Sequence, residues 1–148
     1  HISSGAEALR RDGLAASAVT VFLHTDFFRE EAPQYHKSLS RNLAMPTADT
    51  IILNREAQNL LGNIYRSGYL YKKCGIELGG LKPAGQVQAD LWQPESTNPV
   101  MEAWDKINRR YGRGRLKLAS ELLAKNWEMN RDRLSQCYTT RFVDLLIV

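Results

Sequence analysis

Apolar and polar residues alternate in three segments of the first half of the chain, and this alternation predicts three β-strands. The segments are residues 17–25, 38–45 and 69–78. A period of two places successive side chains on opposite faces of a strand. The predicted apolar faces consist of Val19, Val21 and Leu23, of Leu39, Leu43 and Met45, and of Leu70, Cys74, Ile76 and Leu78. Residues 26–37, which contain Pro33, are expected to form a loop.

A short helix is expected before the first strand. Ser4 and Glu7 have the spacing of a capping box, and Gly13 is placed to end the helix. Ala6 and Leu9 are its candidate core residues. Because the helix is short, we expect the chain to begin inside an element that is longer in a parent protein.

Helical spacing predicts two more helices. One opens within residues 46–50 and ends at Gly68, and the other starts at Pro99 with Asn98 as its cap and ends at Gly112. The candidate N-caps of the first are Thr47, Asp49 and Thr50. Their apolar stripes are Leu53, Ala57, Leu60, Leu61 and Ile64, and Val100, Trp104, Ile107 and Tyr111.

The order helix, strand, strand, helix, strand predicts an α+β fold, with an antiparallel sheet that carries helices on one face and is open on the other. The open face would present Thr20, His24, Ser38, Ser40, Tyr71 and Lys73. Hydroxyl groups and lysine are groups that hold DNA phosphates. From the residues alone, a solvated sheet face without a ligand is the more common explanation.

Charge adds a second candidate region for nucleic acid. The chain has 20 Lys and Arg against 16 Asp and Glu, and residues 100–148 hold 10 of the basic and 6 of the acidic residues. Arg109, Arg110, Arg113 and Arg115 surround Tyr111 and two glycines. This cluster could bind phosphate, or it could be the solvated end of a helix; spacing alone leaves both open.

The composition and the motifs of the chain argue against several classes of protein. No segment approaches the ~20 apolar residues of a membrane span, and Cys74 and Cys137 cannot build a disulfide framework. We therefore expect a cytoplasmic protein that does not bind membranes. No phosphate-binding glycine loop, zinc-ligand spacing or converging carboxylate set is present. We predict no catalytic residue, metal or cofactor in this chain.

Residues 81–85 (LKPAG) have the composition of a linker, and a Leu-Trp pair follows in a polar run. A tryptophan in a linker suggests a docking peptide. The alternative is a linker with two stray apolar residues.

Several motifs resemble the Y-family translesion DNA polymerases of the UmuC type. Those resembling the little-finger domain are residues 33–35 (PQY), 46–50 (PTADT) and 68–76 (GYLYKKCGI). Those resembling the C-terminal extension are residues 107–114 (INRRYGRG), 127–129 (WEM) and 134–141 (LSQCYTTR). The resemblance implies a little finger over residues 1–82, a linker over 83–99 and an extension over 100–148. The family's first little-finger strand, and the palm that binds Mg²⁺, are expected to be missing.

The resemblance also implies partners. The little finger would hold primer–template DNA in an error-prone polymerase of the SOS response, through the open-face residues, Lys37 and the arginine cluster. Residues 88–92 (QADLW) resemble a sliding-clamp-binding peptide, which places Gln88, Asp90, Leu91 and Trp92 at the clamp. A UmuD-type dimer, for which residues 100–148 are the leading candidate, and the RecA filament are the other expected partners.

Two alternatives remain open. The chain could be a stand-alone, truncated module that binds the clamp or UmuD without polymerase activity. It could also be an unrelated basic DNA-binding protein.

Overall fold

A computed structural model describes residues 1–29, 31–86, 99–112 and 114–121. Contacts divide the chain into two units, His1–Leu116 and Lys117–Val148. The elements of the first unit are α1 (Ile2–Arg11), β1 (Leu14–Thr25), β2 (His36–Thr47), α2 (Thr50–Ile64), β3 (Tyr71–Gly79), β4 (Lys82–Pro83), the 3-10 turn η1 (Ala84–Gln86) and α3 (Pro99–Tyr111). The predicted three strands and three helices are all present.

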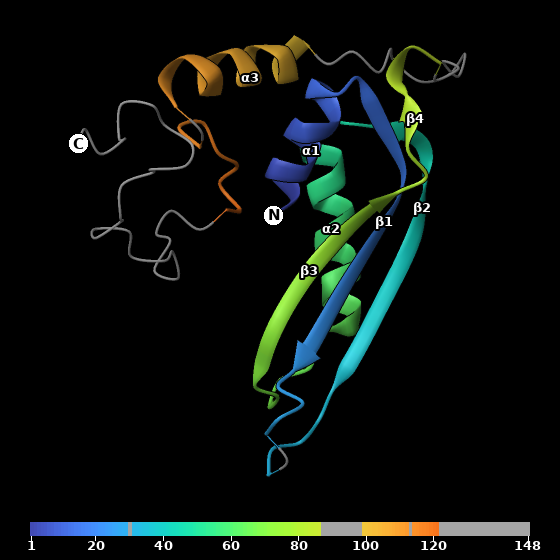
Figure 1. Cartoon of the computed structure of the whole chain (residues 1–148), viewed down its shortest axis with the longest axis vertical. Coiled ribbons are helices and arrows are strands. Elements are labelled where there is room, and N and C mark those ends of the chain that lie inside the picture. Colours follow the sequence, from blue (N-terminus) through green and yellow to red (C-terminus); the bar gives the residue numbers. More distant parts are fainter. Residues whose placement is uncertain (30, 87–98, 113, 122–148) are drawn as a thin grey trace, which may run out of the picture. The chain divides into compact units, whose positions relative to one another are not determined.

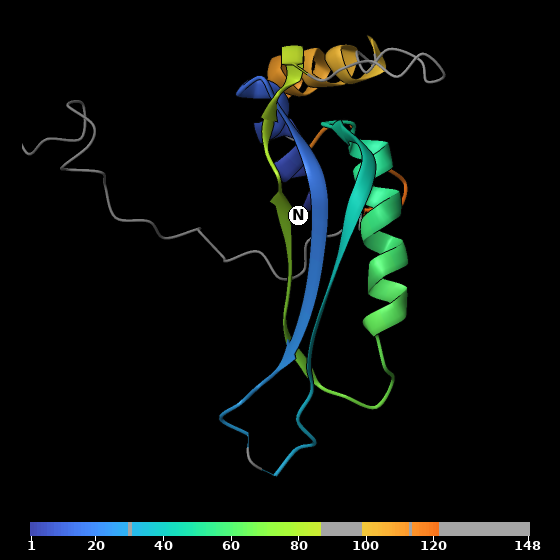
Figure 2. The ribbon, with the colours of Figure 1, turned by 90° about the vertical axis from the view of Figure 1, so that its right-hand side faces the viewer.

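The sheet is antiparallel, with β1 in the centre between β2 and β3. The short strand β4 pairs with the start of β1. In Figure 1 the long strands lie in front of α2, and Figure 2 shows α2 along one side of the sheet. The predicted α+β class, with helices packed on one face of the sheet, is confirmed.

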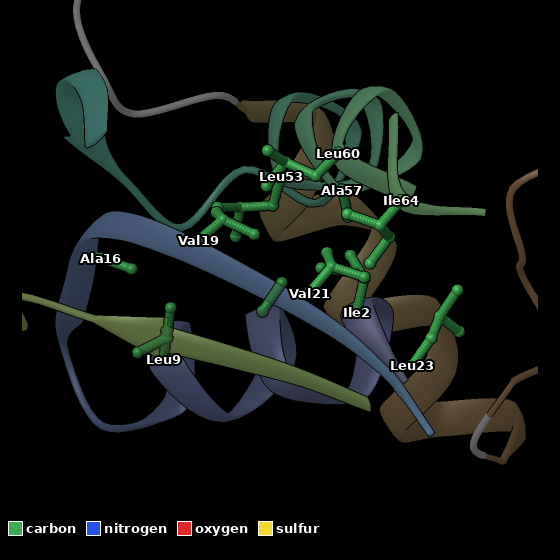
Figure 3. Packing of buried hydrophobic residues seen from close by; sticks show 11 residues of the cluster. Ile2, Leu9, Ala16, Val19, Val21, Leu23, Leu53, Ala57, Leu60 and Ile64 are labelled. Atoms are coloured by element: carbon green, nitrogen blue, oxygen red, sulfur yellow. The ribbon is translucent and has the colours of Figure 1, made fainter. Parts of the chain in front are cut away.

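The core lies between the sheet and the helices α1 and α2. Val19, Val21 and Leu23 of β1 are almost completely buried, as the alternation predicts. They belong to one cluster with residues of both helices (Figure 3), namely Ile2, Ala6, Leu9, Leu53, Ala57, Leu60 and Ile64. Burying a side chain of this kind stabilises the fold by roughly 1.5–3 kcal/mol, so these positions anchor the helices on the sheet.

The sequence predicts some helix ends correctly and others wrongly. The carboxylate of Asp49 caps α2 and accepts hydrogen bonds from the backbone N–H groups of Ile51 (2.7 Å) and Ile52 (3.3 Å). Helix α1, in contrast, begins at Ile2 without a side-chain cap, so the capping box at Ser4 is wrong. Helix α2 ends at Ile64, four residues before Gly68, which has a positive φ of 90° within the turn to β3.

A register shift in the β1–β3 pairing overturns one predicted face. Lys73 is opposite His24, but Tyr71 is opposite Thr25, so Lys72 is an additional residue in β3. Such a bulge turns the preceding side chains to the other face. Tyr71 therefore packs against the core, and its hydroxyl donates a hydrogen bond to the Arg66 carbonyl (2.9 Å). Leu70, predicted to be apolar core, is 65% exposed.

The predicted linker composition at residues 81–85 is also misleading. Lys82–Pro83 forms β4 against Leu14 and Ala15, and the Ala84 backbone N–H donates to the Gly13 carbonyl (2.8 Å). The turn residues thus fold back onto the start of β1. Residues 87–98, including the whole of the predicted clamp peptide, lie outside the described residues.

Helix α3 begins at Pro99 and ends before Gly112, as predicted; Asn98 lies outside the described residues. Its predicted apolar stripe is largely exposed, since Val100 is 54%, Ile107 40% and Tyr111 60% exposed. The buried residue is Met101 (2%) instead. Met101 is next to Val100, the first residue of the predicted stripe. Tertiary packing therefore turns α3 so that a neighbouring position, rather than the stripe, is buried.

Candidate nucleic-acid interface

The candidate interface is the open face of the sheet, defined here by the side chains that β1, β2 and β3 direct away from the core. Side chains directly opposite one another in antiparallel strands lie on the same face. The pairing therefore gives three cross-strand rows: Ser40, Thr20 and Glu77; Ser38, Phe22 and Gly75; and His36, His24 and Lys73. Five of the predicted residues, Thr20, His24, Ser38, Ser40 and Lys73, are brought together on this face.

The first row is a polar patch with an acidic neighbour. The Thr20 and Ser40 hydroxyl groups share a hydrogen bond of 2.8 Å on the exposed surface. One of the two oxygens can donate outward to a phosphate while the other donates within the pair. Glu77 stands on the opposite side of Thr20. Its carboxylate offsets the charge of Lys73, so the electrostatic attraction of this face for phosphate is modest.

The other two rows form an aromatic patch. The ring of Phe22 lies 5.2 Å from that of His24, and the ring of His24 lies 4.2 Å from that of His36. Phe27, from the loop after β1, contacts both histidines at 5.8 and 6.3 Å between ring centres. Sequence reasoning did not select Phe22, His36 or Phe27, although alternation already placed Phe22 beside Thr20 and His24.

Partial burial and two neighbouring groups lower the pKa of His24. Partial burial of the imidazole is the largest cause, followed by repulsion from His36 and from Lys73. Each of these effects disfavours the protonated form. His24 therefore presents a neutral ring near neutral pH, which suits aromatic contact more than phosphate binding.

The two predicted lysines lie on different faces. The ammonium group of Lys73 is 5.8 Å from the centre of the Phe22 ring on the open face. Lys37 is opposite Leu23, whose side chain is in the core. Lys37 therefore belongs to the helix-covered side of the edge strand β2. Lys37 is therefore not part of the open face, and its contact with DNA stays a prediction.

The predicted arginine cluster is separate from the sheet residues. Arg109 and Arg110 are exposed at the end of α3, and the Arg115 side chain donates to the Tyr111 carbonyl (3.2 Å). Helix α3 is joined to α1, which packs on the covered side of the sheet, by an ion pair between Arg10 and Asp105. Arg113 lies outside the described residues.

Two kinds of feature, a metal-binding cluster and a membrane-spanning helix, are absent from the described residues. In that part of the chain, no three or more His, Cys, Asp or Glu side chains form a group able to hold a metal ion. None of its helices has the length and apolar character needed to cross a membrane.

Comparison with known proteins places these features in a family. Residues 1–91 match the impB/mucB/samB family C-terminal domain, and residues 98–148 match a domain of unknown function. The chain is 33% identical to the protein ImpB of Salmonella typhimurium over 98% of its length, and 32% identical to the protein UmuC of that species over 100%. It is 29% identical to the protein MucB of Escherichia coli over 91%.

The matches cover only part of each relative. The chain spans 35% of ImpB, 36% of UmuC and 32% of MucB. Since the family match takes in residues 1–91 of 148, the chain belongs to the impB/mucB/samB family and contains its C-terminal domain, the little-finger region of the UmuC-type proteins.

Proposed function

We propose that this chain is the DNA-holding part of an error-prone translesion DNA polymerase that acts in the SOS response. The observation that carries the proposal is the open sheet face within a little-finger domain of this family. Thr20, Ser40 and Lys73 share that face and offer two hydroxyl groups and an ammonium group. These groups suit contacts with the phosphates of primer–template DNA, which position a duplex without selecting its sequence.

Nucleotide transfer belongs to the part of the relatives that this sequence does not match. There, Mg²⁺ would neutralise the charge that develops on the phosphates. The residues of this chain would hold the duplex and set its path. Because Glu77 offsets Lys73, we expect weak and adjustable binding, as suits an enzyme that must move along damaged DNA.

The test is the salt dependence of binding to a labelled primer–template duplex. Lys73→Ala should weaken binding for all sequences alike and reduce the slope of log K against log salt by about one. Arg55→Ala, on the exposed surface of α2, is the matched control and should leave the slope unchanged. Equal slopes for the parent chain and Lys73→Ala would remove the open face from the DNA-binding site.

Docking to a sliding clamp is proposed for residues 88–92. Leu91 and Trp92 would enter an apolar pocket, Gln88 would bond at its rim, and Asp90 would stay solvated. Replacing Leu91 and Trp92 together by Ala removes ~3–6 kcal/mol of apolar transfer energy before ordering costs. Lost clamp binding in calorimetry with an unchanged melting temperature supports docking; a lowered melting temperature with binding intact contradicts it.

A contact with a UmuD-type dimer is proposed for residues 100–148, and a contact with the RecA filament for the parent protein. The exposed apolar side chains of α3, Val100, Ile107 and Tyr111, support a protein partner for this region. Ile107→Asp should abolish co-elution with the dimer, whereas Lys106→Asp, at an exposed neighbouring position, should not.

A further inference from the structure

The aromatic patch of the open face consists of four rings in contact, and the backbone leaves space for them. Phe22, His24, His36 and Phe27 form a continuous chain of ring contacts with centre-to-centre distances from 4.2 to 6.3 Å. The backbone makes room for it, because a Cβ atom at Gly75 would overlap the ring tip of Phe22. Glycine at position 75 thus lets the Phe22 ring lie across β3.

The loop that carries Phe27 is held in place by Gln34. The Gln34 side-chain amide donates to the carbonyls of Asp26 (3.1 Å), Arg29 (2.8 Å) and Ala32 (3.2 Å). Its own carbonyl accepts a hydrogen bond of 2.8 Å from the Thr25 hydroxyl. A loop fixed in this way presents Phe27 without a large ordering cost on binding.

Two of the four rings are exposed, and a lysine lies beside the patch. Phe27 is 60% exposed, and His36 is also exposed. Lys73 lies over the Phe22 ring. Of the acidic residues nearby, Asp26 is paired with Lys72 at 2.7 Å, and Glu77 lies in the row of Thr20 rather than in the rows of the rings. Exposed rings beside an ammonium group are the combination that binds the bases and backbone of single-stranded nucleic acid.

A duplex cannot use such rings fully, because its base faces are already stacked on one another. Unpaired bases have free faces, and the patch continues the same sheet face as the Thr20–Ser40 pair. We propose that the aromatic patch stacks unpaired bases of single-stranded DNA next to the duplex held by the polar patch. This proposal rests on the proposed function for the adjoining duplex, but the two sites bind different forms of DNA.

The experiment measures the affinity of the whole chain for three labelled probes: a short thymidine oligonucleotide, an abasic oligonucleotide of the same length, and a blunt duplex. The two single strands carry the same phosphates, so their difference reports stacking alone. The parent chain should bind the thymidine strand more tightly. Phe27→Ala should weaken that binding roughly 5- to 150-fold and leave the affinities for the abasic strand and the duplex unchanged.

Phe28→Ala is the matched control. Phe28 is the next residue, is 92% exposed, and contacts Lys72 rather than the histidines. The Phe28→Ala variant should bind all three probes as the parent chain does. The Phe27→Tyr variant keeps an aromatic ring and should retain stacking. Circular dichroism checks that each variant is folded.

Equal affinities of the parent chain for the thymidine and abasic strands, or no binding of the thymidine strand, would overturn the stacking proposal. An equal loss in Phe28→Ala would overturn it as well. Failure of the duplex proposal would give a different result. The preference for the thymidine strand over the abasic strand would remain, but the salt slope of duplex binding would be the same for Lys73→Ala and the parent chain.

Discussion

Arg10 joins three elements that are far apart in the sequence, and its removal gives a quantitative test of the packing. Its guanidinium group forms a two-bond fork with the Asp105 carboxylate, with both N–O distances at 2.7 Å. A further nitrogen donates to the Ala48 carbonyl (2.6 Å) and the Thr50 hydroxyl (2.8 Å). One side chain thus ties α1 to the start of α2 and to α3.

The burial of the pair sets the expected energy. The side chains of Arg10 and Asp105 are each 15% exposed. Exposed ion pairs contribute ~0.2–1 kcal/mol, whereas removing one partner of a buried pair costs ~3–5 kcal/mol. We therefore expect Arg10→Ala to lower the free energy of unfolding by about 2–3 kcal/mol. Asp105→Asn, which leaves the bonds to Ala48 and Thr50 in place, should cost about 1–2 kcal/mol.

Urea denaturation measures both losses, and amide hydrogen exchange shows where they act. Asp105→Asn should accelerate exchange mainly in α3, and Arg10→Ala should do so in α3 and in the first turn of α2. Arg11→Ala is the control, because the Arg11–Asp12 pair is 61% and 52% exposed and should contribute little. An Arg10→Ala loss no larger than that of Arg11→Ala would refute the reasoning, as would unchanged exchange in α3.

Two further predictions concern the sheet. Gly80→Ala should lower the free energy of unfolding by about 1–2 kcal/mol, because Gly80 has a positive φ of 59° and an added Cβ would overlap the Ser17 hydroxyl. Urea denaturation measures the loss. Gly79→Ala is the control, because an added Cβ at Gly79 meets only ordinary contacts. His24 has a lowered pKa in the folded chain, so the unfolded chain binds its proton more tightly, and stability should fall as the pH drops below about 6.5. His24→Phe should reduce this fall in melting temperature, and an unchanged pH profile would contradict the assignment.

Much of the architecture follows from local patterns in the sequence. Alternation over residues 17–25 already identifies Val19, Val21 and Leu23 as core, because the two faces of a strand differ in every second residue. Asp49 and Pro99 mark helix starts because capping and fixed φ act within a few residues. These signals need no knowledge of distant contacts.

Long-range pairing decided the composition of the candidate site. The additional residue Lys72 moves Tyr71 from the open face to the core, and a bulge of this kind depends on the partner strand rather than on the sequence of β3 alone. Phe27 meets His24 and His36 from the loop between β1 and β2, in which Gln34 donates hydrogen bonds to the Asp26 and Arg29 carbonyls on either side of it. Similarly, Arg10 meets Asp105 across 95 positions of sequence. Hydrophobic periodicity assigns residues to the two faces of a strand. It carries no information on which strands pair, on their register, or on the path of a loop. The pairing, the register and the loop path determine which side chains could contact DNA.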